Sequence, residues 1–171
     1  MGKITIKQGD ITQEVVDVIV NAANTTLRGG GGVDGAIHRA AGRSVLEECI
    51  KIGGCPTGEA VITDAGKLKA KKIIHTVGPV WNGGKKGEGA LLRGCYRHSF
   101  QLARQENLKS IAFPAISAGA YGYPIELATE IALEEGLHFQ NDFVEIRFVC
   151  FSEKDLNVYR LTFEKIAPQD V

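Results

Sequence analysis

The sequence lacks an excess of charge of either sign, since its 171 residues contain 20 lysines and arginines and 20 aspartates and glutamates. Proteins that bind nucleic acids depend largely on positive charge that neutralises phosphates. We therefore expect no obligate nucleic-acid partner, and an RNA-binding role finds little support. A small diphosphate needs only a few local hydrogen-bond donors, so the neutral balance does not argue against that kind of ligand.

Long apolar runs are also missing. No stretch approaches the roughly 20 residues that a membrane-spanning helix needs, and Lys3, Lys7 and Asp10 interrupt the apolar core of a secretory signal. The start Met1-Gly2 is compatible with myristoylation, but Ile6 occupies the position where serine or threonine is required. These features predict a cytoplasmic protein without a membrane partner.

Patterns for metal binding or redox chemistry are absent as well. The cysteines form no Cys-x-x-Cys pair, which favours reduced, partly buried thiols. The histidines show no zinc-ligand spacing, and there is no Gly-Lys-Ser/Thr loop for a nucleoside triphosphate. We therefore expect neither a metal ion nor a cofactor. The residues concerned are Cys49, Cys55, Cys95, Cys150, His38, His75, His98 and His138.

What the sequence does contain is an alternation of strand and helix patterns. Helix 44–50 has Ser44 as its expected N-cap, with Glu47 three residues later in a capping-box pattern. The alternation is typical of an α/β layer fold with a largely parallel sheet, and no linker or repeat suggests more than one domain. Strands are predicted at residues 3–8, 16–20, 60–64, 72–77, 110–116 and 143–151, and helices at 33–39, 44–50, 90–106, 124–136 and 156–166.

Two glycine-rich segments each follow a predicted strand and precede a predicted helix, at residues 29–32 and 117–124. Glycine lets the backbone approach a ligand closely. The free N–H groups and the positive dipole at a helix start bind anions. Because ligands of open α/β sheets bind beyond the carboxyl ends of the strands, we expect the two segments to flank one cleft and to hold a diphosphate.

The first glycine segment also matches the dinucleotide fingerprint Gly-x-Gly-x-x-Gly at residues 30–35. In that fingerprint a tight turn follows the strand at once, whereas the predicted strand ends at Val20, ten residues earlier. The acidic residue that should follow about 20 positions later is replaced by the loop 53–56. A hydride-transferring Rossmann enzyme is therefore disfavoured.

Four motifs in order resemble those of the macrodomain family, in its MacroD-type branch that processes ADP-ribose. They are GDIT at 9–12, NAAN at 21–24 with the glycines of 29–35 and His38, HTVGP at 75–79, and ISAGAYGYP at 116–124. The resemblance covers residues 1–171 and implies a single macrodomain. It also implies a three-layer α/β/α sandwich around a mixed, mostly parallel six-stranded sheet, with ADP-ribose in a cleft at the strand ends.

The resemblance implies roles for individual side chains, and each has a plainer structural alternative. Asp34 would orient or deprotonate the attacking water, or only interact with the helix dipole. Asn24 would hold the distal ribose and the reacting group, or cap its loop. His38, four residues after Asp34, would support that carboxylate or serve as an ordinary structural histidine. Asp10 would accept from the adenine amino group or bond its own turn, and Phe151 would stack on adenine or pack in the core.

The same resemblance implies further ligand contacts, most of them through the backbone. Tyr121 would lie near the distal ribose. The alternative is that Tyr121 and Tyr123 pack on the core, and the two tyrosines can also divide these roles. For loop capping, Asn21 is a better candidate than Asn24. The remaining predicted contacts are Ile11, Ala22, Gly32, Val33, Ser117, Ala118, Gly119 and Ala120.

The activity that the resemblance implies is hydrolysis of ADP-ribose derivatives without a metal ion. The expected reactions are deacetylation of O-acetyl-ADP-ribose and removal of mono-ADP-ribose from acidic side chains, so the expected partners are ADP-ribose, O-acetyl-ADP-ribose and mono-ADP-ribosylated proteins. Water attacks an ester linked to the distal ribose in both, and a substrate phosphate can assist it. The alternative is a reader that binds ADP-ribose without chemistry. Readers often lack the asparagine and aspartate pair, which is present here as Asn24 and Asp34.

Overall fold

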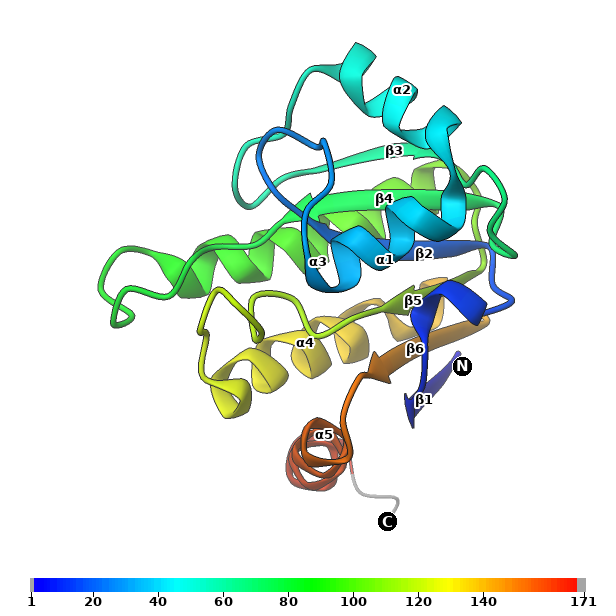
Figure 1. Cartoon of the computed structure of the whole chain (residues 1–171). Coiled ribbons are helices and arrows are strands. Elements are labelled where there is room, and N and C mark those ends of the chain that lie inside the picture. Colours follow the sequence, from blue (N-terminus) through cyan, green and yellow to red (C-terminus); the bar gives the residue numbers. More distant parts are fainter. Residues whose placement is uncertain (1, 169–171) are drawn as a thin grey trace.

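Six strands form one mixed sheet in the computed structural model, which describes residues 2–168 (Figure 1). Neighbouring strands are parallel except β3, which runs antiparallel to β4 at one edge. This arrangement confirms the predicted mixed, mostly parallel sheet. In order across the sheet, the strands are β1 (Lys3–Gln8), β6 (Glu145–Cys150), β5 (Ser110–Phe113), β2 (Val18–Ala23), β4 (Lys72–Val77) and β3 (Ala60–Asp64).

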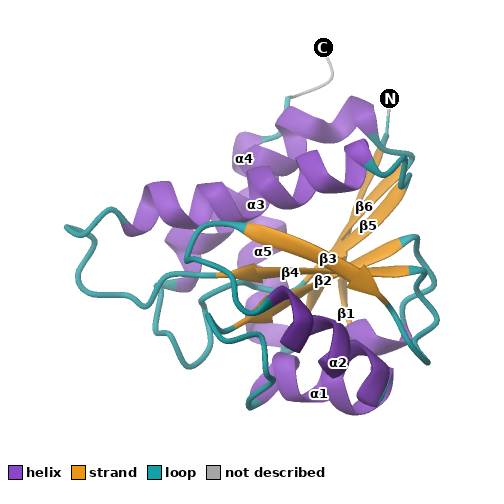
Figure 2. Cartoon of the chain, turned by 90° about the horizontal axis from the view of Figure 1, so that it is seen from above, coloured by secondary structure: helices purple, strands orange, loops and turns teal. Residues whose placement is uncertain are grey.

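Helices cover both faces of the sheet and give the predicted three layers (Figure 2). On one face lie α1 (Gly32–Ala41) and α2 (Arg43–Ile52). On the other lie α3 (Glu88–Gln105), α4 (Ile125–Phe139) and α5 (Glu153–Ile166). Two short 3-10 helices, η1 (Ile11–Gln13) and η2 (Gln140–Asp142), complete the elements. Within residues 2–168, every helix is too short or too polar to cross a membrane.

Strand alternation divides the core into two parts. Val20 of β2 packs with α3 and α4, whereas Ile19 packs with α1 and α2, because successive side chains of a strand point to opposite faces. The same alternation directs Asn21 toward α1 and α2. Asn21 is fully buried there, and its partner in the register with β4 is His75, which is also fully buried. Two polar side chains therefore lie side by side under α1.

Several element boundaries differ from those predicted. β2 runs from Val18 to Ala23 rather than over 16–20, since Asn21 and the alanines after it pair with β4. β5 ends at Phe113, before Pro114, which has no N–H to donate to a neighbouring strand. Strand β6 is shorter than predicted at both ends, whereas all five helices are longer or begin earlier.

The predicted cap of the second helix is wrong. The N-cap of α2 is Gly42, which is also the C-cap of α1, so Ser44 lies inside the helix. Ser152 does cap α5, since its Oγ accepts a hydrogen bond of 3.1 Å from the N–H of Asp155.

These two serines make a matched test of the helix boundaries. Ser152→Ala should lower the free energy of unfolding by about 1 kcal/mol, because the N–H of Asp155 loses its acceptor. Ser44→Ala should leave it unchanged or slightly raised, because Ser44 is exposed within a helix and alanine has the higher helix propensity. Chemical denaturation measures both variants. A loss of about 1 kcal/mol in Ser44→Ala would contradict the assigned start of α2.

Candidate active site

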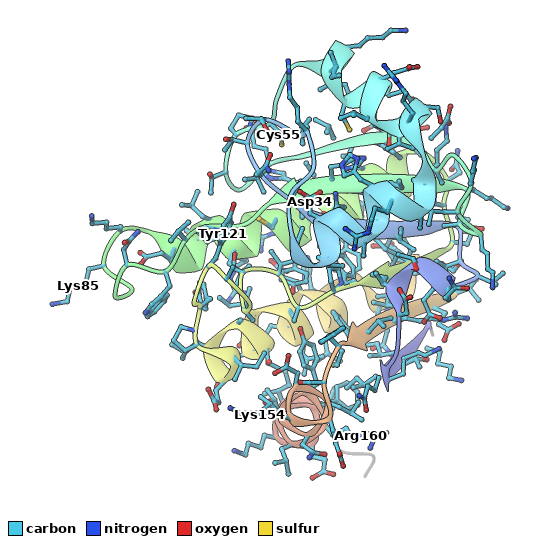
Figure 3. The ribbon with its side chains drawn as sticks, in the orientation of Figure 1. Asp34, Cys55, Lys85, Tyr121, Lys154 and Arg160 are labelled. Atoms are coloured by element: carbon cyan, nitrogen blue, oxygen red, sulfur yellow. The ribbon has the colours of Figure 1, made fainter. Side chains whose placement is uncertain are left out.

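Loops that follow the parallel strands β2, β4 and β5 lie at one edge of the sheet, the edge formed by the carboxyl ends. They are residues 24–31, 78–87 and 114–124. Figure 3 shows Asp34 on α1 and Tyr121 in the loop after β5. The N–H of Trp81 donates to the carbonyl of Tyr121 at 2.8 Å, which joins the second and third loops. A recess of about 560 Å³ lies beside α2 and β3, away from these loops. It does not coincide with the ADP-ribose cleft expected at the loops, and that cleft stays a prediction.

Asp34 is buried in the first turn of α1. Its Oδ1 accepts a hydrogen bond of 2.9 Å from Asn21 Nδ2 and lies 3.5 Å from His38 Nε2, an ion-pair distance. Its Oδ2 lies toward Gly30, where a Cβ would be 3.3 Å from Oδ2 and 3.5 Å from Asn24 Nδ2. The protein therefore holds one carboxylate oxygen and leaves the other beside the glycine loop. The predicted proximity of His38 and Asp34 is confirmed.

The loop before α1 is capped by Asn24 and not by Asn21, the better candidate for that role in the sequence. Asn24 caps its own loop, because its Oδ1 accepts from the N–H of Leu27 at 3.1 Å and its Nδ2 donates to the carbonyl of Gly29 at 2.8 Å. The interpretation of Asn21 as the loop cap is wrong, since Asn21 lies within β2 and bonds Asp34. The role of Asn24 toward the distal ribose stays a prediction, and its place beside Gly30 and Asp34 is compatible with it.

A chain of buried hydrogen bonds continues behind Asp34. Asn21 Nδ2 lies 3.1 Å from His75 Nδ1, and His75 Nε2 lies 2.9 Å from Thr63 Oγ1. Burial lowers the pKa of His75 to about 3, with a further contribution from the charge of His38, so the His75 ring is neutral near pH 7. Sequence analysis missed this chain. Its members are far apart in sequence, and only strand alternation could have suggested that they meet.

The fold also brings His38, Cys49 and His75 together, with their ligand atoms within 4.8 Å of one another. Sequence spacing could not show this group, because its members come from α1, α2 and β4. Both ring nitrogens of His75 already have hydrogen-bond partners. Burial, with the charges of Glu48 and Asp34, raises the pKa of Cys49 to about 11, which disfavours the thiolate that binds metals. Hydrogen bonding accounts for the position of His75 in the group.

The loop after β5 places its two tyrosines differently. Ser117 is buried at the start of this loop and has a φ of 64°, in the left-handed region. Its carbonyl accepts from the N–H of Tyr123 at 3.0 Å. Tyr123 is buried, with its ring centroid 4.7 Å from that of Trp81, whereas Tyr121 is partly exposed. The alternative that both tyrosines pack on the core is therefore wrong, and the division of roles between them is supported.

The glycine- and lysine-rich loop after β4 is organised around Glu88. This buried residue at the start of α3 accepts hydrogen bonds from the N–H groups of Asn82 at 2.9 Å, Gly84 at 2.9 Å and Lys86 at 2.6 Å. Burial acts to raise the pKa of its carboxyl, but the backbone donors outweigh it and lower the pKa to about 2. Glu88 therefore anchors the backbone of this loop to the start of α3. Lys85 in the same loop extends away from the sheet (Figure 3).

The predicted adenine contacts lie after β1 and β6, which are neighbours in the sheet. Asp10 Oδ1 accepts from the N–H of Thr12 at 3.0 Å, so the turn-forming role of Asp10 is confirmed. Ile11 is buried beside it. Phe151 is 90% exposed, so the alternative that it packs in the core is wrong. An exposed aromatic ring at this edge is available for stacking.

The remaining predicted contacts lie at the same edge of the sheet. Ala22 is near the end of β2, and Gly32 and Val33 begin α1. The N-cap of α1 is Gly31, so no side chain caps the N–H groups of its first turn, which are free to bind an anion. Residues 118–120 lie in the loop after β5 and are partly or fully exposed.

Comparisons with known proteins agree with this arrangement. A family model described as "Macro domain" matches residues 20–132. A Macro domain-containing protein of Methanosarcina mazei is 55% identical over 167 residues, which covers 96% of this chain and 89% of the relative. A protein of Escherichia coli named O-acetyl-ADP-ribose deacetylase is 51% identical over 164 residues, which covers 92% of this chain and 93% of the relative.

Solved structures show the same similarity. A mutant macrodomain of Oceanobacillus iheyensis with ADPR has a TM-score of 0.88 and 45% identity, covering 94% of this chain and 91% of that one. A macrodomain of Trypanosoma brucei in complex with ADP-ribose has a TM-score of 0.87 and 43% identity, covering 92% of this chain and 68% of that one.

Proposed function

Since the chain belongs to the macrodomain family, we propose that it is a hydrolase that deacetylates O-acetyl-ADP-ribose. The observation that carries the proposal is the setting of Asp34. One of its oxygens is held by Asn21, and the other lies toward the glycine loop beside Asn24. Relatives that carry the name O-acetyl-ADP-ribose deacetylase at about half sequence identity support it.

In the proposed complex, the diphosphate lies between the start of α1 and the loop after β5. The N–H groups of Gly32 and Val33 and those of residues 118–120 donate to its oxygens, and each such charge-assisted bond contributes about 1.5–3 kcal/mol. The adenine stacks on Phe151, with Asp10 near its amino group. This placement puts the distal ribose next to Asn24 and Asp34.

In the proposed reaction, a water molecule donates a hydrogen bond to Asp34 Oδ2 and attacks the carbonyl carbon of the acetyl ester. A bond forms between the water oxygen and that carbon, and the bond from the carbon to the ribose oxygen breaks. The proton that leaves the water ends on the ribose oxygen, so the products are acetate and ADP-ribose. A phosphate of the substrate can share in accepting this proton. These groups supply the chemistry of the step without a metal ion.

The same site serves a second proposed substrate, mono-ADP-ribose linked to acidic side chains of proteins. That linkage is also an ester of the distal ribose, so the attacking water, Asp34 and Asn24 have the same roles. Phe151 and the loop after β5 bind only the ADP-ribose part, and the acyl group of either substrate extends away from them.

The test of the proposed function is acetate release from O-acetyl-ADP-ribose by the unaltered protein, with and without a chelator, beside calorimetric titration with ADP-ribose. We expect turnover that the chelator does not change, and a dissociation constant of roughly micromolar, about −8 kcal/mol. Binding without turnover on either ester would identify a reader. Failure to bind ADP-ribose would exclude both functions.

A further inference from the structure

The amide of Asn21 joins the carboxylate of Asp34 to the ring of His75. Its Nδ2 lies 2.9 Å from Asp34 Oδ1 and 3.1 Å from His75 Nδ1. An amide nitrogen carries two hydrogens, and a carboxylate oxygen accepts one of them. The second hydrogen is therefore directed at His75 Nδ1, which must be the unprotonated nitrogen of a neutral ring.

Thr63 fixes the other side of the same ring. Its hydroxyl donates to the carbonyl of Asp64 at 2.9 Å, so its oxygen is free to accept from His75 Nε2 at 2.9 Å. The proton of the neutral ring is therefore on Nε2. All three side chains are buried, with Asn21 and His75 fully so, and the low pKa of His75, about 3, keeps the ring neutral.

The orientation of the Asn21 amide is maintained although it leaves one of its own atoms unsatisfied. Asn21 Oδ1 is buried and has no hydrogen-bond partner among residues 2–168. A flip of the amide would direct this oxygen at Asp34 Oδ1 and at His75 Nδ1, which are both acceptors. The observed orientation therefore depends on His75 presenting an unprotonated Nδ1 to Asn21.

We propose that His75, oriented by Thr63, is a positioning residue that acts through Asn21 to fix the carboxylate of Asp34 for attack by water. The inference rests on the proposed function, since it assigns to the site a residue that does not touch substrate. With Oδ1 held by Asn21, the carboxylate cannot rotate freely, and Oδ2 is kept toward Gly30 and Asn24. Loss of the His75 acceptor leaves the second hydrogen of the amide unpaired in a buried site, and the amide that holds the carboxylate is then less firmly oriented.

Two substitutions separate this role from simple filling of the core. In His75→Asn, the side-chain oxygen can take the place of Nδ1 and accept from Asn21, although more of the ring volume is lost. In His75→Gln, the longer side chain fills more of the volume and reaches Thr63, but it leaves no acceptor at the position of Nδ1. If His75 positions Asn21, the asparagine variant should retain the higher kcat. If His75 only fills the core, the glutamine variant should retain the higher kcat.

We expect kcat for acetate release to fall about 10- to 100-fold in His75→Gln, because that variant leaves a buried donor of Asn21 unpaired. In His75→Asn, which keeps an acceptor for Asn21, kcat should fall no more than about fivefold. KM and the ADP-ribose dissociation constant should change by less than about threefold in both, since the diphosphate contacts are untouched. Equal kcat values, or the reverse order, would overturn the inference. Absence of turnover in the unaltered protein would instead overturn the proposed function and with it this inference.

A measurement on the unaltered protein covers the case in which the variants do not fold. Long-range proton–nitrogen correlation spectra report which ring nitrogen of a histidine carries the proton. We expect a neutral His75 with the proton on Nε2 throughout the pH range of activity. A proton on Nδ1 would exclude the bond from Asn21 and overturn the inference.

Discussion

Asp34→Asn is expected to lower turnover on O-acetyl-ADP-ribose by about 10²–10⁴-fold, the usual contribution of a general base, while ADP-ribose still binds. The substituted amide has nearly the shape of the carboxylate and can still accept from Asn21 Nδ2 through its oxygen. Its nitrogen replaces Oδ2 and cannot take a proton from water. Initial rates of acetate release and calorimetric titration with ADP-ribose measure the two effects separately.

The affinity for ADP-ribose should stay the same or increase in Asp34→Asn. A carboxylate beside a diphosphate repels it, so removal of the charge removes an unfavourable term. Asp34→Ala should lose turnover to a similar extent, but it also leaves the buried Nδ2 of Asn21 without its acceptor, at about 1–3 kcal/mol. The asparagine variant is therefore the cleaner test.

Asp142→Asn is a matched control. Asp142 lies in η2, before β6 begins, and pairs at 3.2 Å with Arg104, and both residues are exposed. Loss of such a pair changes stability by less than about 1 kcal/mol, and turnover should stay at the level of the unaltered protein. Turnover of Asp34→Asn equal to that of this control would remove Asp34 from the mechanism and leave the substrate phosphate to activate the water.

The order of strands and helices and the two glycine loops could be predicted because their signals are local. Residues 29–32 are four consecutive glycines, the loop after β5 carries Gly119 and Gly122, and each segment comes after an apolar run. The edge at which they meet follows from parallel strand pairing alone. The resemblance to macrodomains depends on these same local motifs, and the family match confirms it.

The roles of Asn21 and Asn24 could not be predicted in the same way. Both are asparagines next to small residues after an apolar run, and the predicted strand ended before either of them. In the structure β2 continues through Asn21, and alternation along the strand directs this side chain inward, opposite His75. The partner that makes a buried amide acceptable is thus 54 positions away, which a local pattern cannot show.

Ser44 shows how a local pattern can mislead. The capping box is present in the sequence, but Gly42, with a φ of 92°, serves as the C-cap of α1 and the N-cap of α2. The two helices are joined by this one residue, so the second has already begun when the chain reaches Ser44. The residue at which α1 ends, rather than the capping-box residues, therefore decides where α2 starts.

The second large effect is expected from Gly35→Ala, in the turn of α1 that contains Asp34. A Cβ at Gly35 would lie 2.3 Å from the carbonyl oxygen of Gly30 and 3.0 Å from Arg39 Nη1. The first of these atoms belongs to the backbone of the glycine loop, so the loop itself must move away from α1. That movement separates Gly30 from Asp34 Oδ2 and displaces the N–H groups proposed to hold the diphosphate.

Gly89→Ala is the matched control, since Gly89 also lies in the first turns of a helix, α3, and a Cβ there would meet only Tyr123 Oη at 3.9 Å. A glycine-to-alanine change within a helix ordinarily raises the free energy of unfolding by about 0.4–1 kcal/mol, and we expect Gly89→Ala to be neutral or stabilising. Gly35→Ala should instead lower the free energy of unfolding by about 1–3 kcal/mol, because its methyl group would overlap with the carbonyl oxygen of Gly30.

Gly35→Ala and Asp34→Asn together distinguish the role of the glycine loop from that of the carboxylate. Gly35→Ala should weaken ADP-ribose binding by more than about tenfold, equivalent to 1.4 kcal/mol, whereas Asp34→Asn leaves binding intact. Denaturation and calorimetric titration of the folded variants measure the two quantities. Unchanged affinity in Gly35→Ala would show that the diphosphate does not depend on the loop before α1. Asp34 would then lie beside a loop that holds no ligand, and the proposed position of the distal ribose would have to be abandoned.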